Sequence, residues 1–418
     1  MDKKALIITY YWPPAGGSGV QRWLYFVKYL REFGIEPVIF TLDNPKYPIE
    51  DPSLERLIPE GIEVIRQKIF EPGQGKSNQS SGFLPEKPSG KQKFKNYIRA
   101  NYFIPDAKKF WIGPSVKKLK KYLKKNPVDW IISTGPPHTT HIIAKKLKAK
   151  TGIKWLADFR DPWTEIDYWH HLPMTNKTKS KHRKLELEVL KTADIVTVVT
   201  PSMKRSYEPF TNECVLITNG YDDIKLPEVP ELDKPLTITH VGSLNVDRNP
   251  VMLWEVLREL IDYHEGFEDV IQINLVGHTA DEVRQSINEF DLGRFVNFTK
   301  YVPNQAATHM QLKSRILLLL VNNVSSAKTI ITGKVFEYLR AKRPILAIAP
   351  VDGDLAEILN ETRSGKVIDF NDREGLKAIL IEFYDAYKNG YLNIKSENIE
   401  KYHRKNLTSQ LSELLKKD

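Results

Sequence analysis

The sequence of 418 residues contains a single cysteine, Cys214, so it can form no internal disulfide and offers no cysteine-rich metal site. Long apolar runs are also scarce, because the strongest one, residues 316–321, is far shorter than the roughly 20 residues that cross a bilayer. The apolar run that follows Lys3 and Lys4 ends at Pro13-Pro14 without a small-residue cleavage site. We therefore interpret that run as a first buried strand and predict a cytoplasmic protein.

Acidic residues are almost absent from residues 87–126. This segment contains thirteen Lys or Arg and one acid, Asp106, so it carries about +12 while the chain as a whole carries +10. Aromatic residues are interspersed among these cations, a mixture that suits anionic headgroups at a membrane interface. The segment therefore predicts peripheral association with the inner face of the cytoplasmic membrane. No signature of a common nucleic-acid module is present, so we predict no nucleic-acid partner.

A different interpretation applies to the second part of this basic segment. In residues 115–126, Val116, Leu119 and Leu123 follow helical spacing. A helix that packs on a sheet and exposes its lysines to solvent would show the same pattern. For residues 87–112, which show little periodicity, the pattern favours an excursion that faces the membrane.

Apolar runs alternate with helical patterns along the chain, which predicts βαβ units and parallel sheets. The predicted strands of the first half are residues 5–10, 37–41, 63–67, 130–133, 154–158, 195–199 and 215–218. Those of the second half are residues 236–241, 271–276, 296–298, 316–321, 344–348 and 366–368. The fold class is therefore α/β, with two doubly wound domains.

Proline and turn residues divide the chain. We predict a first domain over residues 1–218, a hinge at 219–235 and a second domain over 236–395, followed by a C-terminal helix at 396–418 that packs back on the first domain. Two parallel sheets across a hinge predict a cleft at the carboxyl ends of the strands, where open α/β sheets bind their ligands.

Glycines follow the first strand at Gly16 and Gly17, directly before a helix, where backbone N–H groups can hold a phosphate. An ordinary strand-to-helix turn would look the same. In the second domain, Gly242 ends a strand and Arg248 precedes a helix, so Arg248 is a candidate to clamp a diphosphate or else a surface arginine.

The segment around residue 334 also joins a strand to a helix. Thr332, Gly333 and Lys334 stand at the predicted helix start, where amides and an ammonium group could meet phosphate. Glu337 follows one turn later and could accept both hydroxyls of a ribose. The alternative is a simple pairing of Glu337 with Arg340 or Lys342.

Two loops end strands of the first domain with polar residues. His138 follows Pro136-Pro137, and we interpret it as a substrate contact or a helix cap rather than a metal ligand. Asp161 follows Arg160 before Pro162 and could orient an acceptor hydroxyl or pair with Arg160.

With these motifs in order, the chain resembles the retaining GT-B glycosyltransferases, a large family that uses nucleotide sugars. The resemblance covers nearly the full length and is closest to members of cell-surface polysaccharide pathways such as lipopolysaccharide synthesis. Its landmarks are GGSGVQR, the PPH strand end, ADFRDPW, TNGYDD, HVGSL with Arg248, LVGH followed by YVP, and GKVFEYLRAKRPILA.

The resemblance implies transfer of a hexose or N-acetylhexosamine from a UDP- or GDP-linked donor to a lipid-linked saccharide acceptor, with retention of configuration and no further cofactor or metal. The residues that it would assign to the donor are Gly16, Gly17, Gly242, Ser243, Arg248, Val302, Thr332, Gly333, Lys334, Val335 and Glu337. It implies electrostatic stabilisation of the departing diphosphate by Arg248 and Lys334. His138 and Asp161 would belong to the catalytic set.

The sequence departs from the family pattern at three positions. The first carboxylate of the Glu-x7-Glu motif is Thr329, the basic residue after the HVG glycine is Ser243, and a histidine before the acid of the middle loop is Arg160. His138 could take over part of that histidine's role. These departures keep two alternatives open, a nucleotide-sugar epimerase of the same fold and a sugar-nucleotide-binding protein without transfer activity.

Overall fold

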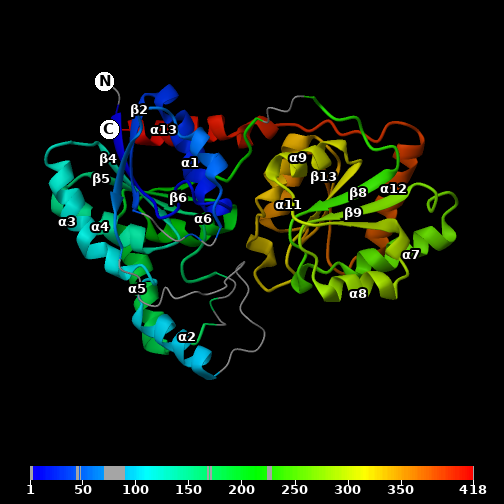
Figure 1. Cartoon of the computed structure of the whole chain (residues 1–418), viewed down its shortest axis with the longest axis horizontal. Helices are drawn as coiled ribbons and strands as arrows, with labels where there is room; N and C mark the ends of the chain where they lie inside the picture. The colour runs from blue at the N-terminus through cyan, green and yellow to red at the C-terminus, as the bar shows by residue number, and fades with distance from the viewer. Residues whose placement is uncertain are drawn as a thin grey trace. The chain divides into compact units, whose positions relative to one another are not determined.

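The structure is a computed structural model that describes residues 3–43, 47, 49–69, 90–166, 169, 172–223 and 228–417. The chain forms two compact units (Figure 1). Unit 1 contains Met1–Asn219 and Arg404–Asp418, and unit 2 contains Gly220–His403. The chain therefore passes from unit 1 to unit 2 after Asn219 and returns after His403, later than the predicted start of the C-terminal helix at residue 396.

Unit 1 is built on a seven-stranded parallel sheet with strand order β3-β2-β1-β4-β5-β6-β7. The strands are β1 (Lys3–Ile8), β2 (Ile35–Leu42), β3 (Glu63–Gln67), β4 (Trp130–Gly135), β5 (Lys154–Phe159), β6 (Ile195–Val198) and β7 (Cys214–Leu216). Both faces of the central strands are buried, as parallel sheets covered by helices require. The order reverses between β1 and β4, and ligands bind at such switch points in open α/β sheets.

Helices cover this sheet and connect its strands. The α-helices of unit 1 are α1 (Ser18–Leu30), α2 (Gly90–Tyr102), α3 (Ile112–Leu123), α4 (Thr139–Thr151), α5 (Asn176–Thr192), α6 (Pro201–Tyr207) and α13 (Arg404–Lys416). Its 3-10 segments are η1 (Arg31–Phe33), η2 (Pro52–Leu57), η3 (Lys109–Trp111) and η5 (Glu208–Phe210). As predicted, the C-terminal helix belongs to the first unit, where α13 lies against α1 and Trp130 donates from Nε1 to the Leu415 carbonyl over 2.7 Å.

Unit 2 repeats the architecture with a six-stranded parallel sheet of order β10-β9-β8-β11-β12-β13. Its strands are β8 (Leu236–Val241), β9 (Ile271–Val276), β10 (Val296–Thr299), β11 (Ile316–Leu320), β12 (Ile345–Ile348) and β13 (Gly365–Ile368). Its α-helices are α7 (Val251–Tyr263), α8 (Asp281–Glu289), α9 (Asn304–Lys313), α10 (Lys334–Ala341), α11 (Asp354–Thr362) and α12 (Arg373–Lys388). Its 3-10 segments are η6 (Val246–Arg248), η7 (Gly293–Phe295), η8 (Ala327–Thr329) and η9 (Ile399–Tyr402). The switch point of this sheet lies between β8 and β11.

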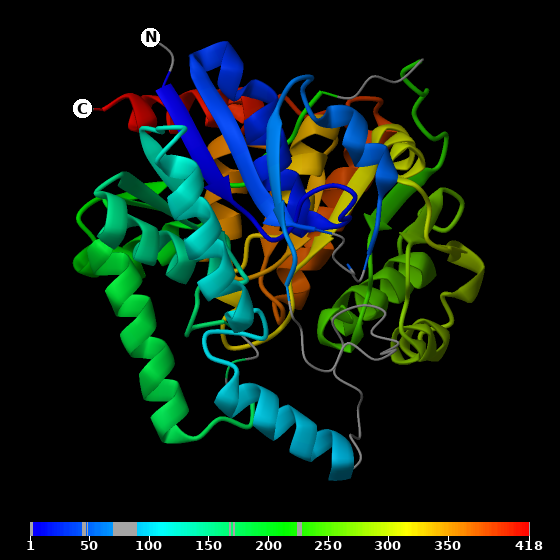
Figure 2. The same ribbon diagram turned by 60° about the vertical axis from the view of Figure 1, so that its left-hand side comes forward.

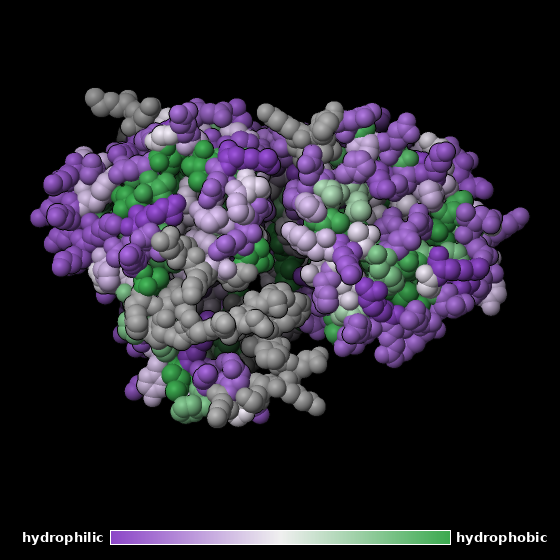
Figure 3. Space-filling model, viewed as in Figure 1, coloured by the Kyte–Doolittle hydropathy of each residue, from purple (hydrophilic) through white to green (hydrophobic). Residues whose placement is uncertain are grey.

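Each predicted strand is present, and its ends agree with the prediction to within two residues. The C-terminal helix is shorter than predicted, because 3-10 turns at Ile399–Tyr402 precede its start at Arg404. Hydrophobic residues of the strands are buried in three core clusters, one in unit 1 and two in unit 2. Hydrophilic residues predominate on the face drawn in Figure 3.

The described part of the basic segment contains two α-helices, α2 and α3. Although residues 87–112 show little periodicity, α2 spans Gly90–Tyr102, while residues 87–89 lie outside the described residues. Figure 2 shows α2 near one end of α5, and Asn101 donates to the Pro173 carbonyl over 2.8 Å there. The alternative interpretation of residues 115–126 is confirmed, because α3 buries Val116, Leu119 and Leu123 and exposes its lysines. No described helix has the length and apolar character needed to span a bilayer.

Candidate functional site

Lys334 lies directly over Gly242 at the switch point of unit 2. Gly242 has a φ of 129°, and a methyl group there would lie 2.3 Å from Lys334 Nζ, so only glycine leaves room for this ammonium group. Gly277 makes a second close approach, because a methyl group there would lie 2.7 Å from the Gly242 carbonyl oxygen. The glycines that end β8 and β9 therefore open the space in which Lys334 is held.

The ring of His240 contacts the ammonium group of Lys334. Its Nδ1 atom is 3.0 Å from the Leu318 carbonyl oxygen, which can only accept, so Nδ1 carries the proton and Nε2 is free to accept from Lys334 Nζ at 3.3 Å. Burial and the nearby Lys334 hold the pKa of His240 well below its usual range, so the ring stays neutral at pH 7. Burial, followed by the charge of Arg248, also lowers the pKa of Lys334 to about 7.

Arg248 lies at the end of η6 and bridges the loops after β8 and β11. Its Nε atom donates to Asn322 Oδ1 over 2.6 Å, and its Nη1 atom donates to the Ser243 carbonyl over 3.4 Å. Burial lowers the pKa of Arg248, and the charge of the neighbouring Asp247 opposes that change. The Asp247 carbonyl accepts from the Asn323 amide over 2.9 Å, which joins the same two loops through the backbone. The side chain of Ser243 is exposed.

Helix α10 places the other predicted donor residues. A methyl group at Gly333 would meet nothing within 4 Å, so the amino end of α10 is open. Glu337 is half-buried, and its Oε2 accepts from Gln311 Nε2 over 2.9 Å. Arg340 donates to the Asp222 carbonyl and to Thr308, each over 3.3 Å.

Three other positions named in the sequence analysis have the following surroundings in the structure. Val335 is fully buried in the core, and its amide donates to the Thr332 carbonyl over 3.1 Å. Val302 is half-buried after β10, two strands away from β8 at the carboxyl edge of the sheet. Thr329, which replaces the first motif carboxylate, lies in η8 and donates from its hydroxyl to the Ser326 carbonyl over 3.0 Å.

The switch point of unit 1 is organised around Arg160. Its Nη1 atom donates to the Gly19 carbonyl over 2.6 Å, and its Nη2 atom donates to the Pro136 carbonyl, so it joins the first turn of α1 to the loop after β4. Burial lowers the pKa of Arg160, and the neighbouring Asp161 opposes that change. Both alternatives for Asp161, orientation of an acceptor hydroxyl and pairing with Arg160, stay predictions.

The glycine loop after β1 is held by its own neighbours. The Gly16 amide donates to the Ile49 carbonyl over 2.9 Å, and a methyl group at Gly16 would lie 2.9 Å from the Ile49 side chain. Gly17 has a φ of 80° and precedes α1. The Gly16 amide is thus already used within the loop, while the positive φ of Gly17 explains why glycine is needed there.

His138 lies at the carboxyl end of β4 and stacks on Trp163, with ring centroids 4.3 Å apart and an interplanar angle of 2°. Its Nδ1 atom is buried and has no hydrogen-bond partner among the described residues. Burial, then the nearby His141, keeps the pKa of His138 well below its usual range. His141 is fully buried beside it, and burial lowers its pKa to about 3. Both rings are therefore neutral at pH 7.

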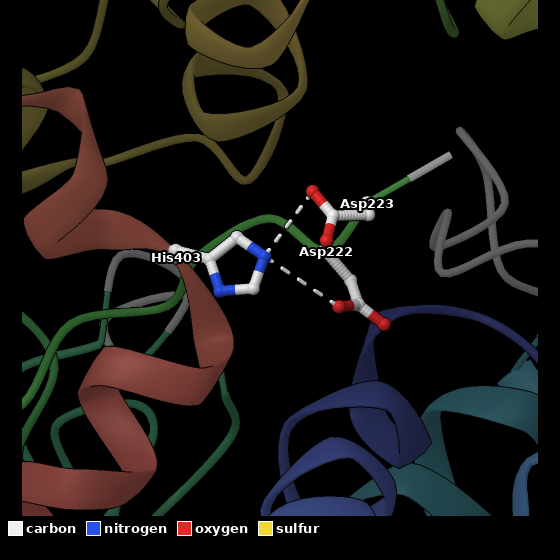
Figure 4. Close-up of side chains that lie close together, drawn as sticks. All are labelled: Asp222, Asp223 and His403. Carbon is white, nitrogen blue, oxygen red and sulfur yellow. Dashed lines mark ion pairs between the residues drawn. The ribbon is translucent and has the colours of Figure 1, made fainter. Parts of the chain in front are cut away.

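A separate cluster that could hold a cation lies in unit 2, where the sequence predicted no metal site. Figure 4 shows Asp222 and Asp223 directed toward His403, with carboxylate oxygens 3.8 Å and 3.4 Å from His403 Nε2. Asp223 is exposed, whereas Asp222 is buried. The pair DD was visible in the TNGYDD landmark, but nothing in the sequence indicated that His403, far along the chain, would join it.

The structure thus brings together Gly242, Arg248 and Lys334 and places Glu337 one turn along the same helix. Sequence reasoning missed three residues that hold them in place, His240, Asn322 and Gln311. His240 could have been found, because it precedes Gly242 in the HVG landmark. The other two left no local signal, since their roles depend on how β11 and α9 pack against α10.

No protein-family model matches the sequence, and no curated relative matches it. Solved structures share its fold over nearly the whole chain. The lipopolysaccharide outer core galactosyltransferase WaaB in its apo form is 14% identical, with a TM-score of 0.58 and 98% of each chain covered. A variant of TarM from S. aureus, in complex with fondaparinux, α-GlcNAc-glycerol and UDP, is 12% identical, with a TM-score of 0.59. The match covers 99% of this chain and 100% of that chain.

A putative UDP-N-acetylglucosamine 2-epimerase from Listeria monocytogenes is 13% identical, with a TM-score of 0.57. The match covers 100% of this chain and 98% of that chain. Identities this low show a common fold and leave activity open. The predicted fold class, two α/β units of the GT-B type with the final helix on the first unit, is confirmed.

Proposed function

We propose that the protein is a glycosyltransferase that uses a nucleoside diphosphate sugar, UDP- or GDP-linked, as its donor. The observation that carries this proposal is the position of Lys334 over Gly242 beside Arg248, at the switch point of unit 2. Two neighbouring cations held beside a glycine at a strand end suit the negative charges of a diphosphate. Similarity in fold to WaaB, a galactosyltransferase, and to a TarM variant in complex with UDP supports the same ligand class.

The same residues would act in the chemical step. When the bond between the sugar and the diphosphate breaks, negative charge accumulates on the leaving phosphate, and fixed cations stabilise that charge. Lys334 is poised for this because a phosphate would raise its pKa from about 7 and keep the ammonium group protonated. Glu337, oriented by Gln311, would accept the ribose hydroxyls. We propose retention of configuration and a lipid-linked saccharide acceptor.

Binding of UDP, GDP and a panel of their sugars, measured by calorimetry and followed by assays for released nucleoside diphosphate, tests the proposal. We expect Glu337→Ala to weaken nucleotide binding by about 2 kcal/mol, roughly 30-fold, because two hydroxyls lose a charged acceptor. Glu282→Ala is the matched control, since Glu282 is an exposed carboxylate in the first turn of α8. No binding of any nucleoside diphosphate would remove the proposal.

The epimerase remains the second candidate, because the Listeria protein is as similar in fold as WaaB. An epimerase needs no second substrate, so donor turnover that is independent of any acceptor would favour it. Donor turnover that rises with an added saccharide acceptor would favour the transferase. A protein that binds nucleotide sugars without turnover under either condition would support the non-enzymatic alternative.

We also propose that α2 docks on anionic membranes. Phe94 and Tyr102 of this helix are 66% and 67% exposed, and Lys93, Lys95 and Arg99 are exposed beside them. The side chain of Lys91 lies outside the described residues. We expect replacement of Lys93 and Lys95 by alanine to weaken binding to phosphatidylserine vesicles by about 2 kcal/mol, roughly 30-fold.

Replacement of the exposed Lys120 and Lys121 of α3 by alanine is the matched control and should change vesicle binding much less. Equal binding of the protein to neutral and anionic vesicles would refute the electrostatic part of this proposal.

A further inference from the structure

A cavity of about 780 Å³ lies within unit 1, beneath α2. Its volume is in the range of about 300–1,000 Å³ that is typical of small-molecule sites. The cavity is bounded by α2, by the segment that follows α2, by the loop after β4 and by the segment between β5 and α5. It reaches Pro136 and His138 at the carboxyl end of β4, so it opens toward the switch point of unit 1.

The wall of this cavity is predominantly apolar. Prolines and the following larger side chains form most of it: Phe103, Trp163, Ile166, Trp169, Leu172 and Met174. Trp163 is fixed in place because its Nε1 donates to His182 Nδ1 over 3.1 Å and its face stacks on His138. Burial lowers the pKa of His182 to about 4, so this ring adds no positive charge at pH 7. A wall of this kind suits a hydrocarbon chain.

The charged groups of the cavity are mostly cationic. Lys93, Arg99 and Lys108 line it, and the only carboxylate in its described lining is Asp106. Asp106 is already engaged, because it accepts from the Thr139 amide and hydroxyl and from the Lys108 amide, each over 2.8 Å. Lys93 and Arg99 form no ion pair with any described residue. Lys93 and Arg99 are therefore available to an anion in this apolar cavity, whereas the Lys108 ammonium group lies over the Tyr10 ring, 4.5 Å from its centroid.

Helix α2 separates this cavity from the outer surface. Its residues Lys93, Asn96 and Ala100 follow helical spacing and line the cavity, while Phe94 and Tyr97 are exposed on other sides of the helix. Asn101 fixes the end of α2, because its side chain donates to the Pro173 carbonyl and accepts from the Thr175 amide, each over 2.8 Å. Helix α2 thus exposes aromatic rings to solvent on one side and lines an apolar cavity on another. A hydrocarbon chain that enters the cavity from a membrane would require this arrangement.

We propose that this cavity binds the hydrocarbon chain of an amphiphile whose phosphate or diphosphate group lies against Lys93, Arg99 and Lys108. The proposal deepens the proposed function, on which it rests for the identity of the amphiphile as the lipid part of the acceptor. A chain in the cavity would direct its head group toward His138, where the saccharide of such an acceptor would lie. Two sources share this chemistry, isoprenoid phosphates and straight-chain alkyl phosphates.

The test measures binding of farnesyl diphosphate and of dodecyl phosphate, each below its micelle concentration, to the full chain by calorimetry and by intrinsic tryptophan fluorescence, to which Trp163 and Trp169 contribute. We expect at least one of them to bind about 100-fold more tightly than inorganic diphosphate, because each buried methylene group adds affinity. The amphiphile that binds more tightly identifies the class of hydrocarbon chain, isoprenoid or straight-chain alkyl. No binding of either amphiphile, or binding no tighter than that of inorganic diphosphate, would overturn the proposal.

Variants locate the bound amphiphile. Ala100→Trp should weaken binding by obstructing part of the cavity, and Ala107→Phe provides a second blocking variant at another part of the wall if the first does not fold. Arg99→Ala should weaken binding about tenfold by removing a charge-assisted contact. Lys120→Ala, on the exposed face of α3, should leave binding unchanged. Unaltered affinity in a folded blocking variant would place the amphiphile elsewhere and overturn the proposal.

UDP and GDP binding measured on the same samples separates this inference from the proposed function. Nucleotide binding with no amphiphile binding would overturn only the cavity proposal. Amphiphile binding with no nucleotide binding would overturn only the transferase proposal.

Discussion

The switch points of the two units use positive charge in opposite ways. In unit 1, Arg160 donates to two backbone carbonyls, and Arg22 is paired with the buried carboxylate of Asp158. In unit 2, Lys334 contacts a neutral histidine and Arg248 contacts a side-chain amide. In the part of the chain that the structure describes, no ion pair joins either of these two to a carboxylate.

This difference indicates a division of roles within one repeated architecture. In unit 1 the cations hold loops and strands together, because Arg22 is paired directly with a carboxylate and the charges of Asp161 and Asp158 act on Arg160. In unit 2 neutral groups hold Lys334 and Arg248, which form no ion pair with a described residue, so the charges of Glu337 and Asp247 offset theirs only in part. Burial of these two cations costs free energy and favours an anionic ligand. The lowered pKa of Lys334 is a sign of that cost.

The largest effect is expected at the buried ion pair of unit 1. Asp158 accepts from Arg22 and also from Trp23, Thr134 and Thr197, and although burial alone would raise its pKa, Arg22 and these hydrogen bonds bring it below its usual value. Arg22→Met should lower the free energy of unfolding by about 3–5 kcal/mol, because it leaves a buried carboxylate unpaired.

Urea unfolding followed by circular dichroism measures this loss. Arg31→Met is the matched control, since Arg31 pairs with Glu36 at the surface and should contribute less than about 1 kcal/mol. An equal loss of unfolding free energy in the two variants would show that the buried Arg22–Asp158 pair stabilises unit 1 no more than a surface ion pair does.

The next largest effect distinguishes the cations of the two units in nucleotide binding. Lys334→Met should weaken binding of UDP or GDP by about 2.7 kcal/mol, roughly 100-fold, because a charged phosphate contact is lost. Arg160→Met should lower the stability of unit 1 and leave nucleotide affinity unchanged. Calorimetric titration of both variants makes the comparison, and a similar loss of affinity in both would break the distinction between the units.

A smaller effect is expected from pH. The pKa of Lys334 is lowered to about 7 in the free protein, so above pH 7 the ammonium group loses its proton and must regain it when a phosphate binds. Nucleotide affinity should therefore fall by up to about tenfold between pH 7.5 and 8.5. Titrations at the two pH values, repeated in buffers of different ionisation enthalpy, count the proton taken up. Lys334→Met should remove the dependence, and its persistence there would assign it to another group.

The smallest effect is expected at Asn322, which positions Arg248. Asn322→Ala removes the acceptor of the 2.6 Å bond from Arg248 Nε and should weaken nucleotide binding by about 1 kcal/mol, roughly fivefold. Asn297→Ala, at an exposed position of the edge strand β10, is the control. An unchanged affinity in Asn322→Ala would mean that Arg248 needs no support from the β11 loop.

The fold was predictable because its signals are local and repeated. The predicted strand at 316–321 includes β11, whose five residues are all apolar and buried, as is typical of a strand that is covered on both faces. Part of the site was predictable for a related reason, because Gly242 and Lys334 stand at strand ends or helix starts. α2 was harder to predict, because its solvent-exposed cations and aromatics do not form a clear apolar stripe.

The sequence by itself determined the alternation of strands and helices, the concentration of positive charge near α2 and the types of residue at each strand end. Only the tertiary structure decided which of those residues meet. It placed Lys334 against Gly242 and His240 and joined Arg248 to Asn322 by a hydrogen bond. It also formed a cavity from segments that precede and follow α4 in the sequence. The physical reason is that spacing along the chain specifies local hydrogen bonding and the buried faces. Burial, and with it the pKa of Lys334 and the pairing of each cation, depends on contacts between residues far apart in sequence.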